Sequence, residues 1–163
     1  MASALAWSDA YRAQARADLE GAKAVSGIAP SVLAMLLQMV FEKLAKAALL
    51  RTGAVTPSFA QSSHAAASHM LRAMRLQRGI LAPLGGAQAW GDVLWVVEEL
   101  ERAHPALAKK GSPQLEYPWE TPQGVVRWPA LHLPMAQSLG SSTLGTRVLK
   151  FATLLEQRFD QIF

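Results

Sequence analysis

The segment from Pro30 to Gly53 constrains the fold more than any other part of the chain. Its polar positions Gln38, Glu42 and Lys46 recur every four residues and form one narrow stripe on a helix, while nearly every other position is apolar. A helix that is apolar around most of its circumference has to be surrounded by other elements. Burying about eight of its large side chains would contribute roughly 12–24 kcal/mol before entropy is subtracted. We therefore expect a central helix whose only solvent-exposed strip is this polar stripe.

Four further helices are predicted around the central one, which gives an all-α fold, an up-and-down bundle of about five helices. Pro30 suits the first turn of the central helix, and Gly53 suits the left-handed residue that ends it. Apolar residues at steps of three and four predict the other helices over residues 8–25, capped by Ser8 or Asp9, from Ser62 or Ser63 to Gly79, from 87 or 92 to 104, and from Ser141 or Ser142 to the end.

An irregular excursion of about residues 105–139 interrupts the helical pattern. Six of the nine prolines lie between Pro105 and Pro134, together with Tyr117, Trp119 and Trp128. Proline second and glycine fourth in Thr121–Gly124 favour a type I turn, so residues 115–120 and 125–128 are expected to pair as a short β-ribbon. Loops this long in a globular domain are more often functional or disordered, and the aromatic residues argue against disorder.

Composition fits a single globular domain over residues 1–163. The chain is 51% hydrophobic and 17% charged, which argues against disorder, and it has no cysteine, which excludes disulfides and thiolate zinc sites. Its start lacks the basic and apolar regions of a signal peptide, and its purest apolar run is too short for a bilayer. We expect a cytoplasmic protein without membrane contact. The net charge of +4 is compatible with an acidic partner, but ordinary solubilising charge is the favoured interpretation.

Four segments of the chain match a family pattern: Trp7 followed by residues 17–22, Phe41–Leu49 with its Glu-Lys-x-x-Lys-Ala order, Ser68-His69-x-Leu71 with His64 as the alternative histidine, and Glu116–Trp119. Together they resemble the HEPN family (higher eukaryotes and prokaryotes nucleotide-binding domains), which are helical bundles. Glu116 stands where some members have Arg. The resemblance implies a homodimer that acts with a nucleotidyltransferase, a nucleotide or RNA, often in toxin–antitoxin systems.

Arg127 and His132 match by spacing the Arg and His pair of catalytic members, which are metal-independent ribonucleases. His could move the ribose 2′-hydroxyl proton while Arg stabilises the phosphate charge. Pro129 forbids a regular helix through the pair, whereas the family places its motif at or near a helix. The alternative is a loop Arg and a loop His that pack beside Trp128.

The spacing of the other histidines gives no indication of a metal site, and we expect no cofactor. His64 and His69 are spaced so that they point to different sides of a helix, with no carboxylate between them. His104 precedes Pro105, and we expect it to interact with the C-terminus of its helix.

The candidate binding residues are an arginine face and the aromatic loop. Arg72, Arg75 and Arg78 repeat every three residues, and with Tyr117, Trp119 and Trp128 they could bind a single strand by charge and stacking. The favoured alternative is a solvated helix face, salt-bridged to Glu98, Glu99 or Glu101.

Three functions remain open on the sequence. The leading hypothesis is a non-catalytic HEPN-like binding or interaction module. The second is a toxin-type ribonuclease that uses Arg127 and His132. The third is a helical bundle with a small-ligand pocket between the bundle and the loop of residues 117–128.

Overall fold

The central helix forms where the sequence predicts it. The computed structural model describes residues 2–141 and 143–163, and in it α2 spans Pro30–Arg51. Its Leu33, Leu37 and Phe41 side chains are fully buried. Gly53 follows with a φ of +70°, the left-handed conformation in which glycine carries no steric penalty, so the predicted end of this helix is confirmed.

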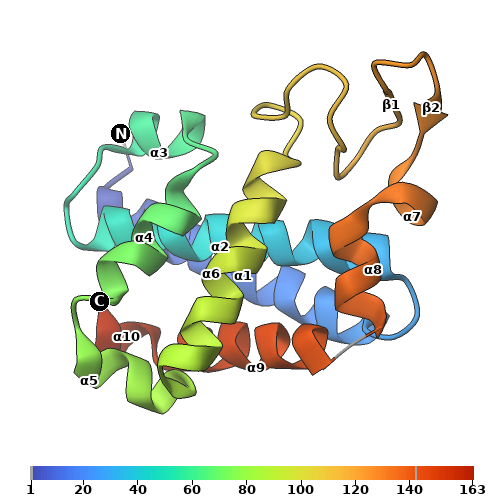
Figure 1. Ribbon diagram of the computed structural model, residues 1–163. Coiled ribbons are helices and arrows are strands. Elements are labelled where there is room, and N and C mark those ends of the chain that lie inside the picture. Colours follow the sequence, from blue (N-terminus) through green and yellow to red (C-terminus); the bar gives the residue numbers. More distant parts are fainter. Residues whose placement is uncertain (1, 142) are drawn as a thin grey trace.

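The remaining elements surround α2, which contacts α1, α3, α4, α6, α7, α8 and α9 (Figure 1). In chain order they are α1 (Ala4–Val25), α3 (Pro57–Ser62), α4 (Ala66–Met74), α5 (Arg78–Leu81), the 3₁₀ helix η1 (Ala82–Leu84), α6 (Gly86–Arg102), β1 (Trp119–Glu120), β2 (Val126–Arg127), α7 (Pro129–His132), α8 (Pro134–Ser141), α9 (Thr143–Gln157) and α10 (Phe159–Ile162). The predicted all-α fold is confirmed. Within residues 2–141 and 143–163, no helix combines the length and the apolar character needed to cross a membrane.

The polar stripe of α2 is not exposed, so the prediction that it forms a solvent-exposed strip is wrong. Gln38 is 6% exposed and Lys46 is 4% exposed, and Glu42 between them is only partly accessible. The sequence pattern shows that the stripe is narrow and polar. It does not show that α4, α6 and the segments around them close over it, because that closure depends on packing between distant parts of the chain.

The first helix starts earlier than predicted. The side chain of Ser3 caps α1 by accepting the Ala6 N–H at 3.1 Å, and neither Ser8 nor Asp9 is a cap. Ser8 is buried instead, and its hydroxyl donates to the carbonyl oxygen of Ala47 in α2 at 2.8 Å. A serine that looked like a helix cap therefore ties α1 to the central helix.

The predicted third helix is broken into α4 and α5, and Gly79 lies inside α5 rather than at a helix end. The short α3 occupies the segment before it, where the sequence predicted a loop. Neither Ser62 nor Ser63 caps α4, whose N-cap residue Ala65 makes no side-chain capping bond. The Ser68 N–H in its first turn donates to Glu101 of α6 at 3.0 Å. The partner that satisfies this helix start thus comes from another helix, which local sequence cannot reveal.

The excursion contains the predicted β-ribbon in shortened form. β1 and β2 pair antiparallel with Trp119 opposite Arg127. The Gly124 N–H donates to the Thr121 carbonyl at 2.9 Å, and Gly124 has a φ of +78°, so the turn predicted at Thr121–Gly124 is confirmed. In Figure 1 this hairpin projects from the bundle at the upper right.

The predicted last helix is divided into α9 and α10. It is preceded by α8, which begins at Pro134 inside the segment that the sequence assigned to the excursion. The side chain of Ser141 and the whole of residue 142 lie outside what the structure describes, and the two predicted caps lie there with them.

Close approach between α8 and α9 makes Gly145 a test of this packing. A Cβ added at Gly145 would lie 2.3 Å from the carbonyl oxygen of Leu139, whereas a Cβ at Gly91 in α6 meets nothing within 4 Å. We expect Gly145→Ala to lower the free energy of unfolding by about 1–3 kcal/mol in urea titrations. Gly91→Ala, the matched control, should raise it by about 0.5–1 kcal/mol through helix propensity. Equal effects of the two substitutions would contradict this packing.

Candidate functional site

Glu42 lies at the centre of a buried polar cluster on α2. Its Oε2 accepts a hydrogen bond from Nε2 of Gln38 at 2.6 Å, and its Oε1 pairs with Nζ of Lys46 at 2.7 Å. The spacing of four residues puts these partners one turn before and one turn after Glu42, on the same face. The ammonium of Lys46 also lies 5.6 Å from the ring centroid of Tyr11 in α1. The stripe that the sequence showed is therefore one continuous, mutually bonded row.

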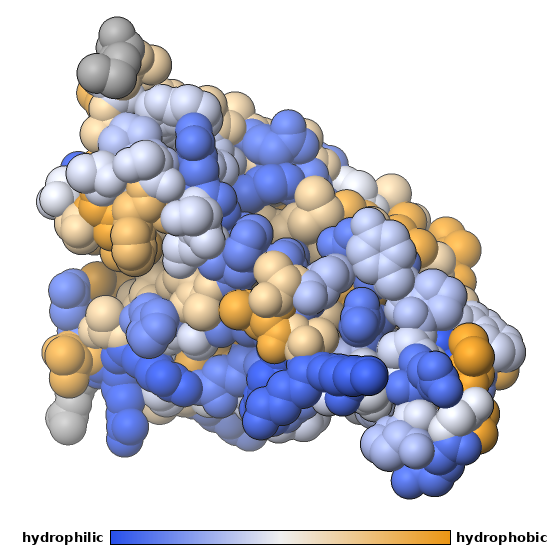
Figure 2. Space-filling model, turned by 90° about the horizontal axis from the view of Figure 1, so that it is seen from above, coloured by the Kyte–Doolittle hydropathy of each residue, from blue (hydrophilic) through white to orange (hydrophobic). Residues whose placement is uncertain are grey.

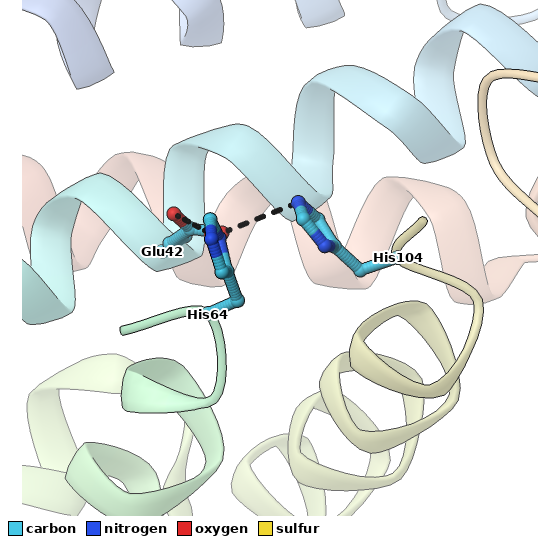
Figure 3. A group of neighbouring side chains, drawn as sticks. All are labelled: Glu42, His64 and His104. Carbon is cyan, nitrogen blue, oxygen red and sulfur yellow. Dashed lines mark ion pairs between the residues drawn. The ribbon is translucent and has the colours of Figure 1, made fainter. Parts of the chain in front are cut away.

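Two histidines from distant segments complete the cluster (Figure 3). His64 comes from the short connection between α3 and α4, and His104 follows the last turn of α6. Their rings stack with centroids 4.5 Å apart and planes 22° from parallel. Nδ1 of His64 lies 3.5 Å from Oε1 of Glu42, and Nε2 of His104 lies 4.0 Å from Oε2. Both imidazoles thus face one carboxylate.

The surroundings favour a charged Glu42 and a neutral His104. Burial raises the pKa of the Glu42 carboxyl, but hydrogen bonds from Lys46 and Gln38 and the nearby positive charge of Lys46 outweigh it and hold that pKa below its ordinary value. Burial lowers the pKa of His104, and Glu42 offsets this effect only in part. The cluster therefore combines a carboxylate with an uncharged imidazole that keeps one ring proton.

His104 does not serve as the simple C-terminal partner that the sequence predicts. Its Nδ1 accepts the backbone N–H of Ala106 at 3.2 Å, and the ring turns toward His64 and Glu42. The helix ends at Arg102, two residues before the predicted end at His104. The path of the chain after α6 places the His104 ring against α2. No local sequence pattern indicates this contact.

A pocket of about 500 Å³ lies on the other side of the same segment, between α6, residues 103–113 and the α7–α8 corner. We call it the α6–α8 pocket. Buried Ala103, Leu133 and Met135 form its floor. Trp95, 47% exposed, and Leu107, 43% exposed, form its walls. Apolar side chains left accessible around a concavity are typical of binding sites.

The rim of the α6–α8 pocket carries charge. Nη1 of Arg102 pairs with Oε1 of Glu99 at 2.8 Å, so these two charges offset each other. Lys109 also lines the pocket and is exposed, and within the described ranges it forms no ion pair. The rim therefore offers one uncompensated positive charge beside apolar walls.

The three predicted arginines do not share one helix, because Arg72 lies in α4, Arg75 follows its last residue and Arg78 begins α5. Nη2 of Arg72 pairs with Oε1 of Glu98 at 2.6 Å, and Arg75 lies over the Trp90 ring at 5.6 Å. Arg78 belongs to α5, but its side chain lies outside the described residues. The two described arginines are already engaged with groups of α6.

The aromatic loop is divided, and it lies far from these arginines. Tyr117 and Trp128 are exposed, whereas Trp119 is 6% exposed and cannot stack on a base. Figure 1 places α4 and α5 at the opposite end of the molecule from β1 and β2. Figure 2 views the molecule from above and shows the apolar groups of this upper face as separate patches between polar groups. The structure does not join the two predicted binding surfaces.

Arg127 and His132 lie near each other in the chain, and His132 makes its contacts with Trp128. Arg127 is in β2 and His132 ends the short α7. The His132 ring packs edge-on against Trp128 at 4.5 Å, and its Nδ1 accepts the Trp128 N–H at 3.3 Å. In the part of the chain that the structure describes, no hydrogen bond or ring contact joins His132 to Arg127.

The residues that the sequence did not select as site candidates are His104 at the cluster, and Trp95, Leu107 and Lys109 at the pocket. His64 was named as a candidate only through the family resemblance. Glu42 and Lys46 were identified, but as an exposed pair. The sequence places His104 near a helix end, just before Pro105. That position indicates where the residue lies along the chain, but it does not indicate what its side chain contacts.

Comparisons of the chain with protein-family models, with curated proteins and with solved structures found no match. The site is therefore described from its own geometry.

The buried ion pair of Glu42 and Lys46 gives a prediction about stability. Glu42→Leu leaves the ammonium of Lys46 buried without its partner, and should lower the free energy of unfolding by about 3–5 kcal/mol in urea titrations. The double variant Glu42→Leu/Lys46→Met removes both charges and should recover most of this loss. A double variant as unstable as the sum of the two single variants would show that the two charges are not coupled.

Proposed function

We propose that this chain is a non-catalytic HEPN-like binding module, and that it binds a small ligand with an apolar body and a negatively charged group. The single observation that carries the proposal is the α6–α8 pocket. Its volume of about 500 Å³ suits a small molecule, since ligand pockets occupy about 300–1,000 Å³.

The chemistry of the lining supports this ligand class. The indole of Trp95 and the side chains of Leu107 and Met135 would cover an apolar or planar body. Lys109 would then meet the anionic group, because Arg102 is held by Glu99. Nucleotides belong to this class, since a base is planar and a phosphate is anionic, and they agree with what the family resemblance implies.

The family part of the proposal rests on the sequence resemblance, with which the fold is compatible. The bundle is all-α, and Glu42, Lys46 and His64 lie together in it although His64 is distant in the chain. His69, the residue first matched to the family pattern, is exposed on α4. Self-association and a nucleotidyltransferase or nucleic-acid partner are part of the same proposal, and light scattering on the purified chain measures the first of them.

Binding of 8-anilinonaphthalene-1-sulfonate, an apolar anion, tests the pocket. We expect saturable fluorescence enhancement with one site per chain. Lys109→Glu should weaken this binding about tenfold, because about 1.4 kcal/mol of charge attraction is reversed. Lys110→Glu, an exposed neighbour outside the pocket, should change it by less than about twofold in physiological salt, where charges more than about 8 Å apart are screened.

A second matched pair of variants distinguishes binding of the probe in the pocket from binding elsewhere on the surface. Trp95→Ala should weaken binding of the probe, and Trp128→Ala, which removes an exposed tryptophan elsewhere, should not. Displacement of the probe by adenosine monophosphate would narrow the ligand class to nucleotides. Equal losses in all four variants would remove the pocket as the binding site.

A cleavage assay distinguishes the binding-module proposal from the ribonuclease alternative, which requires RNA cleavage that depends on Arg127 and His132. We expect no RNA cleavage above background from the purified chain, and no difference between it and His132→Ala or Arg127→Ala, because the His132 ring packs on Trp128 and accepts the backbone N–H of Trp128. Labelled RNA incubated with EDTA measures this. Cleavage that disappears in both variants would instead establish the enzyme.

A further inference from the structure

The cluster around Glu42 brings together side chains that bind transition metals. Glu42, His64 and His104 each offer one ligand atom, and these atoms all lie within 4.8 Å of one another. They come from α2, from the α3–α4 connection and from the end of α6, so the cluster is created by the fold and not by a local motif. Figure 3 shows both rings directed toward the carboxylate.

The separations are close to those of a tetrahedral site. Ligand atoms about 2.0–2.2 Å from a zinc ion lie about 3.3–3.6 Å from one another at the corners of a tetrahedron. The Glu42 oxygens lie 3.5 Å from Nδ1 of His64 and 4.0 Å from Nε2 of His104. These are two different oxygens, and the three ligand atoms as a set lie within 4.8 Å of one another. Side-chain shifts of up to about 1 Å, together with a tilt of the stacked rings away from each other, would bring these three groups to bonding positions.

One atom of the cluster has an unmet bonding requirement. Nδ1 of His64 is buried and has no hydrogen-bond partner, although the Glu42 carboxylate is its neighbour. Buried polar atoms are nearly always bonded, so an exception at a functional site calls for an explanation. A metal ion between the imidazole and the carboxylate would supply the missing partner.

Two contacts oppose a metal, and both can be accommodated. Nδ1 of His104 accepts the Ala106 N–H, which places the ring proton on Nε2, whereas a metal needs the lone pair of Nε2. Ala106 is exposed, so its N–H can bond to water while the proton moves to Nδ1. The second contact is that of Lys46 with Glu42. A carboxylate oxygen can accept more than one bond, so Lys46 and Gln38 can keep orienting it, as partners of a metal-binding carboxylate commonly do.

We propose that Glu42, His64 and His104 bind a Zn²⁺ ion, with Lys46 and Gln38 as positioning residues and a water molecule at the fourth corner. Two imidazoles and one carboxylate are a known ligand set for zinc with an open position. The positive charge of Lys46 weakens this site, which leads to a specific expectation: its removal should tighten binding. The proposal is independent of the α6–α8 pocket.

Calorimetric titration of the EDTA-treated full chain with Zn²⁺ tests the proposal. We expect one ion per chain, and a loss of affinity of at least tenfold in His64→Ala and in His104→Ala. The chain has four histidines, so His69→Ala and His132→Ala serve as matched controls and should bind as the unaltered chain does. Lys46→Met should bind several-fold more tightly.

Co²⁺ gives a second measurement that surface binding would not reproduce. Tetrahedral coordination should produce strong visible absorption in the unaltered chain, and this absorption should be absent in Glu42→Gln. Glu42→Gln nearly preserves the shape of the side chain, so it should keep the fold even if either alanine variant unfolds. Circular dichroism on Glu42→Gln checks this. Binding that falls equally in all four histidine variants, a spectrum of hydrated Co²⁺, or no saturable binding would each overturn the proposal.

Discussion

The carboxylate of Glu42 is the constraint on which the arrangement around α2 depends. An ionised group that is largely removed from water requires opposite charge and hydrogen bonds nearby. Gln38 and Lys46 provide these from the same helix, and His64 and His104 face the carboxylate from two other segments. The α3–α4 connection and the end of α6 are thereby tied to a single side chain of the central helix.

The end of α6 joins the two sites of the molecule. Ala103 lines the α6–α8 pocket, and the next residue, His104, turns to the opposite side and faces Glu42. Leu107 then returns to the wall of the pocket. Because one short segment contributes to both sites, its path after the helix determines the shape of each. α6 ends at Arg102, and Pro105 three residues later prevents the helix from continuing along this path.

The polar residues that carry the family resemblance have a structural explanation in this fold. Glu42 and Lys46 form a pair that is shielded from solvent, and His64 lies against it. A pair in this environment is sensitive to the loss of either partner, unlike an exposed pair at the same spacing. The zinc proposal rests on this geometry, and the binding-module proposal rests on that of the pocket.

The sequence by itself determined what depends on neighbouring residues: the all-α class, the central helix with its ends, and the turn at Thr121–Gly124. Helical periodicity and turn chemistry are local, so they can be read directly. Only the tertiary structure decided that the stripe of Gln38, Glu42 and Lys46 is covered, that the predicted third helix is broken, and that His104 meets His64. These features depend on which distant segments pack together, and the free energy of that packing is a property of the whole core rather than of any one segment.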